Sequence, residues 1–148
     1  TFGPRQSARA IIPTIITQAL VENKVAIGND EPTRDFNYVA NTVDGMIETA
    51  RSDKSIGEVI NLGSGAEISI GDLAKKIISL LGKNVRIVQE KERFRPDKSE
   101  VMRLVADNSK AKKLLGWAPK ISFEDGLKKT IEWISDNLGA YKADLYNK

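Results

Sequence analysis

The chain has 148 residues, of which 41% are hydrophobic and 29% charged, and its 23 basic and 20 acidic side chains leave a net charge of +3. This composition can bury a real core, so we expect one folded domain rather than a disordered chain. Cysteine and histidine are both absent, which excludes disulfides, thiolate nucleophiles, imidazole bases and nearly every zinc site.

The charge and hydropathy patterns narrow the class of partner. A weak positive charge spread along the chain favours an anionic small ligand over a nucleic acid. No apolar run reaches the roughly 18 residues of a membrane span, and the first residues are too polar for a signal peptide. We therefore expect a soluble, cytoplasmic protein that binds neither membrane nor nucleic acid.

The chain begins with a predicted helix. Ser7 has the side chain of an N-cap, and apolar residues recur at helical spacing after it, which predicts a helix over about residues 8–23. Pro13 falls inside this helix and is expected to bend it. Because the helix is unusually apolar, we also expect a homo-oligomer.

Short strands and a second helix follow. Residues 25–27 predict a strand that ends in a Gly-Asn-Asp turn, and residues 36–39 predict another extended segment. This segment leads into a helix over about residues 40–51. Two short strands therefore flank a polar loop that carries Arg34.

The middle of the chain has the pattern of a βαβ-like unit. Residues 58–62 predict a strand, residues 63–65 a glycine turn and residues 70–81 a helix that ends at Gly82. Residues 85–88 predict the second strand of the unit. A charged loop over residues 91–100 follows.

Two more helices are predicted near the C-terminus. A brief strand at 104–106 precedes a short helix that ends at Gly116, and a capping box that begins with Ser122 starts the final helix. Residues 139–148 show no periodicity. We therefore expect a small α/β portion over residues 1–138, with short strands and about five helices, and a tail over residues 139–148.

Residues 3–6 read Gly-Pro-Arg-Gln just before the first helix. Free backbone donors at a helix N-terminus, with Arg5 and Gln6 beside them, can hold a phosphate or a sugar oxygen. The alternative is an ordinary Gly-Pro turn with solvated side chains.

Two arginines occupy separate polar segments. Arg34 carries a guanidinium that suits a diphosphate or a ribose, although an ion pair with the adjacent Asp35 explains it equally well. Arg95 lies in the charged loop together with Lys91 and Lys98, where the alternative is a solvated surface.

A glycine turn follows Asn61 and imitates part of a dinucleotide-binding fingerprint. Asn61 can donate to a phosphate or ribose oxygen while the glycines at 63 and 65 let a ligand approach. However, Ile68 replaces the third glycine of the fingerprint, and Glu90 lies farther on than the usual spacing of about 20 residues. We therefore do not expect this unit to bind NAD.

Four segments together resemble a known family. Residues 1–6, residues 33–39 (Thr-Arg-Asp-Phe-Asn-Tyr-Val), residues 95–101 (Arg-Pro-Asp-Lys-Ser-Glu-Val) and residues 115–119 (Leu-Gly-Trp-Ala-Pro) resemble the C-terminal, substrate-binding portion of the nucleotide-sugar epimerases and dehydratases. These enzymes are Rossmann-type extended short-chain dehydrogenases. One departure is Phe2, which stands where the family more usually has tyrosine.

The resemblance implies roles for the candidate residues. Arg34 and Arg95 would hold the diphosphate of a nucleotide-diphosphate sugar, and Asn61 would add a polar contact. The remaining candidates, which would approach sugar or phosphate groups, are Arg5, Gln6 and Arg9. The Trp117 segment is expected to be structural, because its indole can bury a large apolar surface.

The resemblance also implies a catalytic half outside this chain. The family's Tyr-x-x-x-Lys pair is missing, since Tyr38 is followed at that spacing by Thr42 and Tyr141 by Leu145. We therefore expect the NAD-binding Rossmann half upstream, and this portion alone to be inactive and to bind no cofactor. The parent reaction would be oxidation at the sugar C4 by NAD, followed by elimination of water or re-reduction.

Two alternatives remain open at this point. The choice between dehydratase and epimerase is not made by these residues, although the stretch from Arg5 to Pro13 resembles dehydratases that act on N-acetylglucosamine nucleotides in nonulosonic-acid pathways. The portion could also be a non-catalytic module that recognises anionic ligands or a protein partner.

Overall fold

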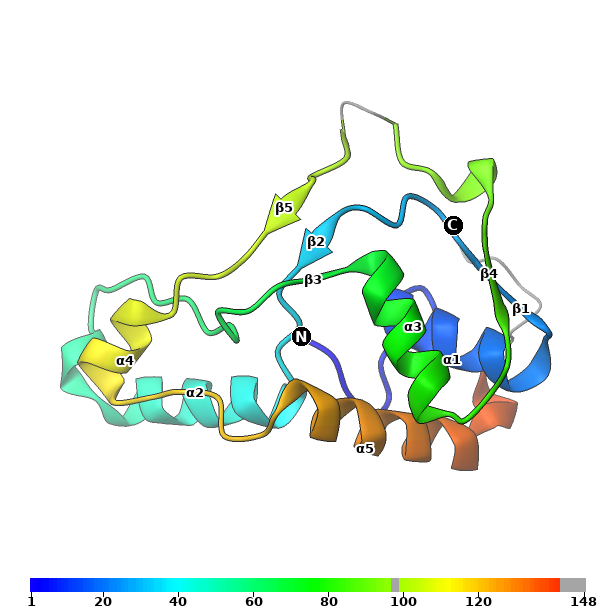
Figure 1. The fold of residues 1–148 in the computed structure, drawn as a ribbon. Coiled ribbons are helices and arrows are strands. Elements are labelled where there is room, and N and C mark those ends of the chain that lie inside the picture. The colour runs from blue at the N-terminus through cyan, green and yellow to red at the C-terminus, as the bar shows by residue number, and fades with distance from the viewer. Residues whose placement is uncertain (97–98, 142–148) are drawn as a thin grey trace.

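A computed structural model describes residues 1–96 and 99–141 of the chain (Figure 1). The described residues form an α/β fold with five α-helices and five short strands, which confirms the predicted class. The elements, in order, are α1 (Ile11–Val21), β1 (Lys24–Ile27), β2 (Thr33–Arg34), α2 (Val39–Arg51), β3 (Ile68–Ser69), α3 (Ile70–Leu80), β4 (Arg86–Gln89), β5 (Arg103–Leu104), α4 (Ser109–Leu115) and α5 (Phe123–Asp136).

The strands form two small sheets. β1 pairs in parallel with β4 along its whole length, from Lys24 opposite Arg86 to Ile27 opposite Gln89. In the second sheet β2 is central, antiparallel to β3 and parallel to β5. Each strand of the second sheet is only two residues long.

The predicted βαβ-like unit is wrong in its first strand. Residues 58–62 form no strand, and β4 pairs with β1 instead. A β-strand requires a hydrogen-bonded neighbour, and within the described residues none lies beside this segment. The Val59 side chain is consequently 83% exposed.

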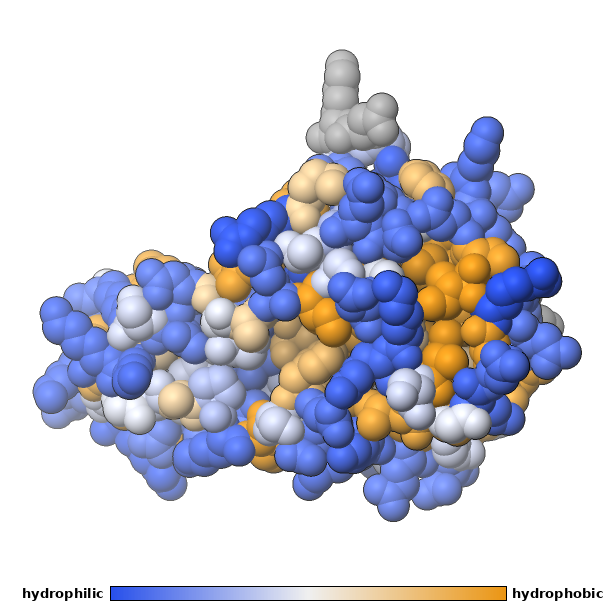
Figure 2. All heavy atoms as spheres, in the orientation of Figure 1, coloured by the Kyte–Doolittle hydropathy of each residue, from blue (hydrophilic) through white to orange (hydrophobic). Residues whose placement is uncertain are grey.

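The hydrophobic core lies where α1, α3 and α5 meet β1. The α1 residues Ile12, Ile15 and Ile16 are at most 1% exposed, and α1 contacts β1, α3 and α5. The apolar character of α1 is therefore explained by burial within this chain. Figure 1 shows α2 and α4 at the opposite end of the molecule, and Figure 2 shows hydrophobic atoms still visible beside α3, toward β4.

The predicted N-cap is correct for α5 and wrong for α1. Ser122 accepts a hydrogen bond from the Asp125 N–H (3.1 Å), as the capping box predicts. By contrast, α1 begins at Ile11 rather than after Ser7, and its N-cap residue makes no side-chain hydrogen bond. Pro13 therefore lies in the first turn, where a missing N–H costs no helical bond, and the helix runs unbroken.

Buried aromatic side chains include Phe2, within a ring cluster, and the indole of Trp117. Phe2 is 1% exposed, and its ring meets those of Phe36, Tyr38 and Phe123 at centroid distances of 5.6 to 6.4 Å. Trp117 is 3% exposed, as expected of a structural residue.

The tail begins in a short 3-10 helix at Leu138–Ala140, and residues 142–148 lie outside the described residues. The Tyr141 hydroxyl donates to the carbonyl of Gln6 (3.1 Å). Within the described part of the chain, no helix has both the length and the hydropathy to span a membrane.

Candidate functional site

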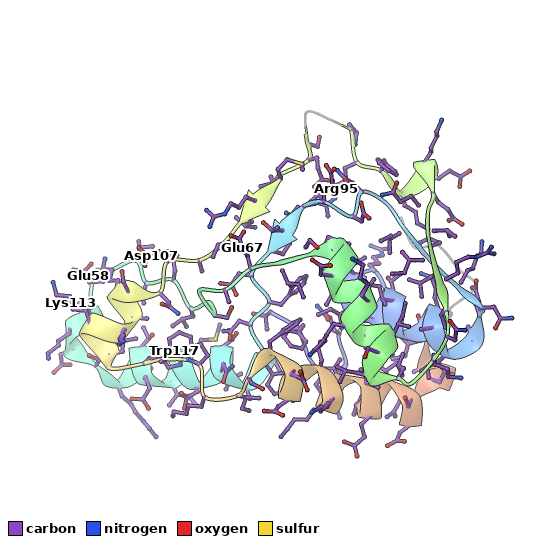
Figure 3. All side chains as sticks on the ribbon, viewed as in Figure 1. Glu58, Glu67, Arg95, Asp107, Lys113 and Trp117 are labelled. Carbon is purple, nitrogen blue, oxygen red and sulfur yellow. The ribbon has the colours of Figure 1, made fainter. Side chains whose placement is uncertain are left out.

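A cleft of about 570 Å³ opens between the N-terminal segment, the start of α1, the turn after β1, β2 and the loop after β4. Four of the six predicted site residues line it, namely Gln6, Arg9, Arg34 and Arg95. These residues come from three segments far apart in the sequence. Figure 3 shows Arg95 on the loop after β4, away from Glu58, Asp107 and Trp117 at the α4 end.

Two predicted residues lie elsewhere. Arg5 is exposed and does not line the cleft, and its φ of 65° is in the left-handed region that favours glycine. Asn61 borders a separate hollow of about 390 Å³. Its side-chain amide donates to the Asp107 carbonyl at 3.4 Å, so it is not brought together with the arginines.

Arg34 lies within β2 rather than in a loop between strands. Its Nη1 donates to the Thr33 carbonyl (2.8 Å) and its Nη2 to Glu100 Oε1 (3.1 Å). The Arg34 and Glu100 side chains are only 18% and 15% exposed. The partner of Arg34 is therefore Glu100, 66 residues away, and not the adjacent Asp35.

Asp35 instead organises the glycine turn. Its Oδ1 accepts from the Ser64 N–H (2.9 Å) and the Ser64 hydroxyl (2.5 Å), and its Oδ2 accepts from the Gly65 N–H (2.9 Å) and the Ala106 N–H (3.3 Å). A Cβ at Gly63 would lie 2.3 Å from that of Ala106. The turn is thus closely packed against Asp35 and Ala106.

The loop after β4 is held against the turn after β1. A Cβ on Gly28 would lie 2.3 Å from the Arg93 carbonyl oxygen, so only glycine permits this approach. The Arg93 Nε donates to Glu90 Oε2 (2.9 Å), and Lys24 also pairs with Glu90 (3.1 Å). These two cations lower the pKa of Glu90 below its ordinary value, Arg93 more than Lys24. Glu90 therefore joins β1 and the loop after β4 through an ion-pair network.

Polar and charged groups of both kinds line the cleft. Four arginines, Arg9, Arg34, Arg93 and Arg95, are among the lining residues, together with Asp35 and Glu100. The Gln6 Nε2 donates to the Thr1 carbonyl (3.1 Å), whereas its buried Oε1 accepts no hydrogen bond within the described part of the chain. The arginines of the lining are donors suited to an anion.

Sequence reasoning missed the roles of Glu100, Asp35 and Gly28. Glu100 belongs to a motif singled out only for its arginine, and nothing local connects it with Arg34. The signal for Asp35 was the glycine turn itself, because exposed N–H groups in such a turn favour an acceptor. Lys98 of the same charged loop lies outside the described residues, and no three acidic residues among those described gather into a metal site.

A model of the family described as GDP-mannose 4,6 dehydratase matches residues 1–130. The chain therefore belongs to the family of nucleotide-sugar epimerases and dehydratases. This membership confirms the resemblance inferred from residues 1–6, 33–39, 95–101 and 115–119.

Individual members of the family support the assignment. The chain is 39% identical over 145 residues to a UDP-glucuronate 4-epimerase of Thermodesulfobacterium geofontis and 32% identical over 148 residues to a dTDP-D-glucose 4,6-dehydratase of Homo sapiens. The alignments cover 96% and 95% of this chain but only 43% and 41% of those proteins. The chain thus spans less than half the length of these family members.

Solved structures of family members share the fold. An epimerase from Methanothermobacter thermautotrophicus matches with a TM-score of 0.84 and 31% identity, over 94% of this chain and 42% of that one. The UDP-glucuronic acid 4-epimerase of Bacillus cereus, solved with UDP-glucuronic acid and NAD, matches with a TM-score of 0.82 and 32% identity, over 92% and 43%. Members of the family therefore include enzymes that bind NAD and a UDP-sugar.

Proposed function

We propose that this chain is the substrate-binding portion of an NAD-dependent nucleotide-sugar 4,6-dehydratase or epimerase. Its role is to hold the nucleotide diphosphate of the sugar substrate in the cleft. The observation that carries the proposal is that Arg34 and Arg95, from separate elements, line the same cleft together with Gln6 and Arg9.

The geometry of Arg34 suits this role. Its guanidinium is fixed through Nη1 and Nη2 by the Thr33 carbonyl and by Glu100, so little side-chain freedom remains to be lost when an anion binds. The group has five donors in a rigid fork and can contact a phosphate while it keeps these partners. Arg95 adds a second arginine to the same cleft, so two guanidinium groups could donate to a diphosphate.

The remaining groups of the cleft suit the sugar. Arg9 and Gln6 both line the cleft and carry side-chain N–H donors that suit sugar oxygens. Arg5 and Asn61, which lie away from the cleft, have no part in the proposed contacts.

The chemistry is assigned to the remainder of the protein. The chain has no Tyr-x-x-x-Lys pair, so its residues would position the substrate rather than transfer protons or hydride. NAD would bind to the other half of the enzyme. Members of the family include both epimerases and dehydratases, and between them we favour a dehydratase acting in the cytoplasm on an N-acetylglucosamine nucleotide.

Calorimetric titration of the chain with UDP-, GDP- and dTDP-sugars tests the proposal. We expect binding of at least one of them, and a loss of about ten-fold or more in affinity for Arg34→Ala and for Arg95→Ala, since charge-assisted hydrogen bonds are each worth about 1.5–3 kcal/mol. Arg103→Ala is the matched control, because Arg103 is exposed, pairs with Glu67 and lies outside the cleft.

The competing interpretation is a module that recognises anionic groups on a protein partner. Absence of binding at millimolar nucleotide sugar would favour that module and contradict the proposal. Equal losses of affinity in Arg103→Ala, Arg34→Ala and Arg95→Ala would mean that the chain recognises anions through its general charge. The arginine clamp, by which we mean Arg34 and Arg95 together, would then not be the binding site.

A further inference from the structure

A nucleotide sugar has three parts, the base, the diphosphate and the sugar, and the groups considered so far would contact only the last two. The arginines suit the diphosphate, and Gln6 and Arg9 suit the sugar. A nucleobase is flat and has a π-face, and proteins commonly bind that face by stacking an aromatic side chain on it. The cleft should therefore contain an aromatic ring with a free face.

Two aromatic residues line the cleft, Phe36 and Phe94. The Phe36 ring is already packed, because it stacks on Phe123 at a centroid distance of 6.1 Å and meets the edge of Phe2 at 6.4 Å. Phe94 is 43% exposed, and it pairs with no other ring within the described residues. Phe94 is therefore the ring that remains available.

The backbone at Phe94 is well fixed. Its N–H donates to the Lys91 carbonyl (3.1 Å) at the end of the 3-10 helix Lys91–Arg93. The same nitrogen lies 3.3 Å from the position that a Cβ on Gly28 would occupy, so the loop is packed against the turn after β1. Exposing a large apolar ring to water is unfavourable, and here no packing contact with another ring of the described residues compensates for it.

Resting on the proposed function, we propose that Phe94 stacks on the nucleobase of the bound nucleotide sugar. Phe94 directly precedes Arg95, one of the two residues assigned to the diphosphate, so base and diphosphate would be bound by neighbouring positions of one loop. Because every base has a π-face, this contact supplies affinity for a nucleotide and little choice among bases.

Titrations with UDP and with inorganic pyrophosphate separate the base contact from the diphosphate contact. We expect Phe94→Ala to weaken UDP binding about 5- to 150-fold, the range observed when a stacking ring is removed, and to leave pyrophosphate binding unchanged. Phe94→Trp should restore UDP binding, and its added fluorescence should be quenched by UDP but not by pyrophosphate. Met102→Ala is the matched control, because Met102 is 49% exposed and lies outside the cleft.

The outcomes distinguish this inference from the proposed function. UDP binding that is equal in the wild-type chain and Phe94→Ala would overturn the stacking and leave the arginine clamp in place. Equal weakening of UDP and pyrophosphate in Phe94→Ala would also overturn it, because the ring would then act by holding the loop. If the wild-type chain bound neither ligand, the proposed function itself would fail, and the stacking with it.

Discussion

Arg34 and Asp35 are neighbours in sequence, but each binds a distant part of the chain. The guanidinium pairs with Glu100, while the carboxylate accepts hydrogen bonds from Ser64, Gly65 and Ala106. In an extended strand successive side chains point to opposite faces, so a residue in β2 and the one after it are expected to have different partners. Local spacing alone suggested an ion pair between them, and only the tertiary structure shows otherwise.

Gly28 provides the first prediction at the scale of a residue. A Cβ at this position would lie 2.3 Å from the Arg93 carbonyl oxygen, a backbone atom that cannot rotate away. We expect Gly28→Ala to displace the loop that carries Arg95 and to weaken binding of a UDP-sugar about ten-fold or more, because misplacement by about 1 Å is costly in a preorganised site. Calorimetric titration measures this directly.

Gly139→Ala is the matched control, since a Cβ there would meet no atom within 4 Å and its φ is not in the left-handed region. Gly28→Ala with unchanged affinity for the UDP-sugar would show that the loop can shift without consequence for the ligand.

At the scale of elements, an ion-pair cluster joins α3 to α5. Glu124, in the first turn of α5, accepts from Lys76 of α3 and pairs with Lys128 one turn further along α5 (3.0 Å). Lys76 is the larger cause and Lys128 the next, and together they lower the pKa of Glu124 from 4.5 to about 2. The cluster adds a polar contact beside the apolar core formed by these helices.

This lowered pKa predicts a pH dependence of stability. A carboxyl group whose pKa is lower in the folded state stabilises the fold above its unfolded pKa, and the contribution disappears as the pH falls toward the folded value. We expect the contribution of Glu124 to be complete above about pH 4.5 and to be lost as the pH falls to about 2.

Urea unfolding of the wild-type chain and of Glu124→Gln between pH 2 and pH 6 measures this contribution. The stability of the two chains should differ at pH 6 and converge toward pH 2. Glu132→Gln, an exposed substitution on the same helix, should follow the wild-type curve. A difference between wild type and Glu124→Gln that stays constant with pH would contradict the assignment.

Local chemistry predicted some elements well and others poorly. The Ser122 capping box and the turn at Gly116, whose φ is 66°, depend on neighbouring residues and were predicted correctly. The strand over residues 58–62 failed because alternation and composition do not show whether a pairing partner exists. The start of α1 was misplaced because Ser7, although a good N-cap residue, accepts from Arg9 in a separate turn (3.3 Å).

The candidate site could be predicted only in part for the same reason. The resemblance to a family identified Arg34 and Arg95, which the structure brings into one cleft. The pairing of Arg34 with Glu100 spans 66 residues, and no pattern within one segment encodes such a contact. Asn61 was placed with the arginines because its strand was expected to end there, and without that strand it faces a different hollow.

At the scale of the whole molecule, exposed apolar side chains gather on α2 rather than on α1. Val43, Met46 and Ile47 are 47%, 60% and 44% exposed, and their spacing places them on one face of the helix. The homo-oligomer expected from the sequence was argued from α1, but seven residues of α1 are buried in this chain. If copies of the chain associate, α2 is the better candidate for the contact.

We therefore predict that the chain self-associates through α2, and that Met46→Lys shifts it toward the monomer in sedimentation velocity experiments at micromolar to millimolar concentration. Burying such a face removes apolar surface from water at about 25 cal/mol per Å², whereas an introduced lysine would have to be desolvated against a second copy. Val21→Lys, at a 51% exposed apolar site at the end of α1, should leave association unchanged. A wild-type chain that stays monomeric throughout would contradict self-association, and an equal effect of both lysine substitutions would place the contact elsewhere than α2.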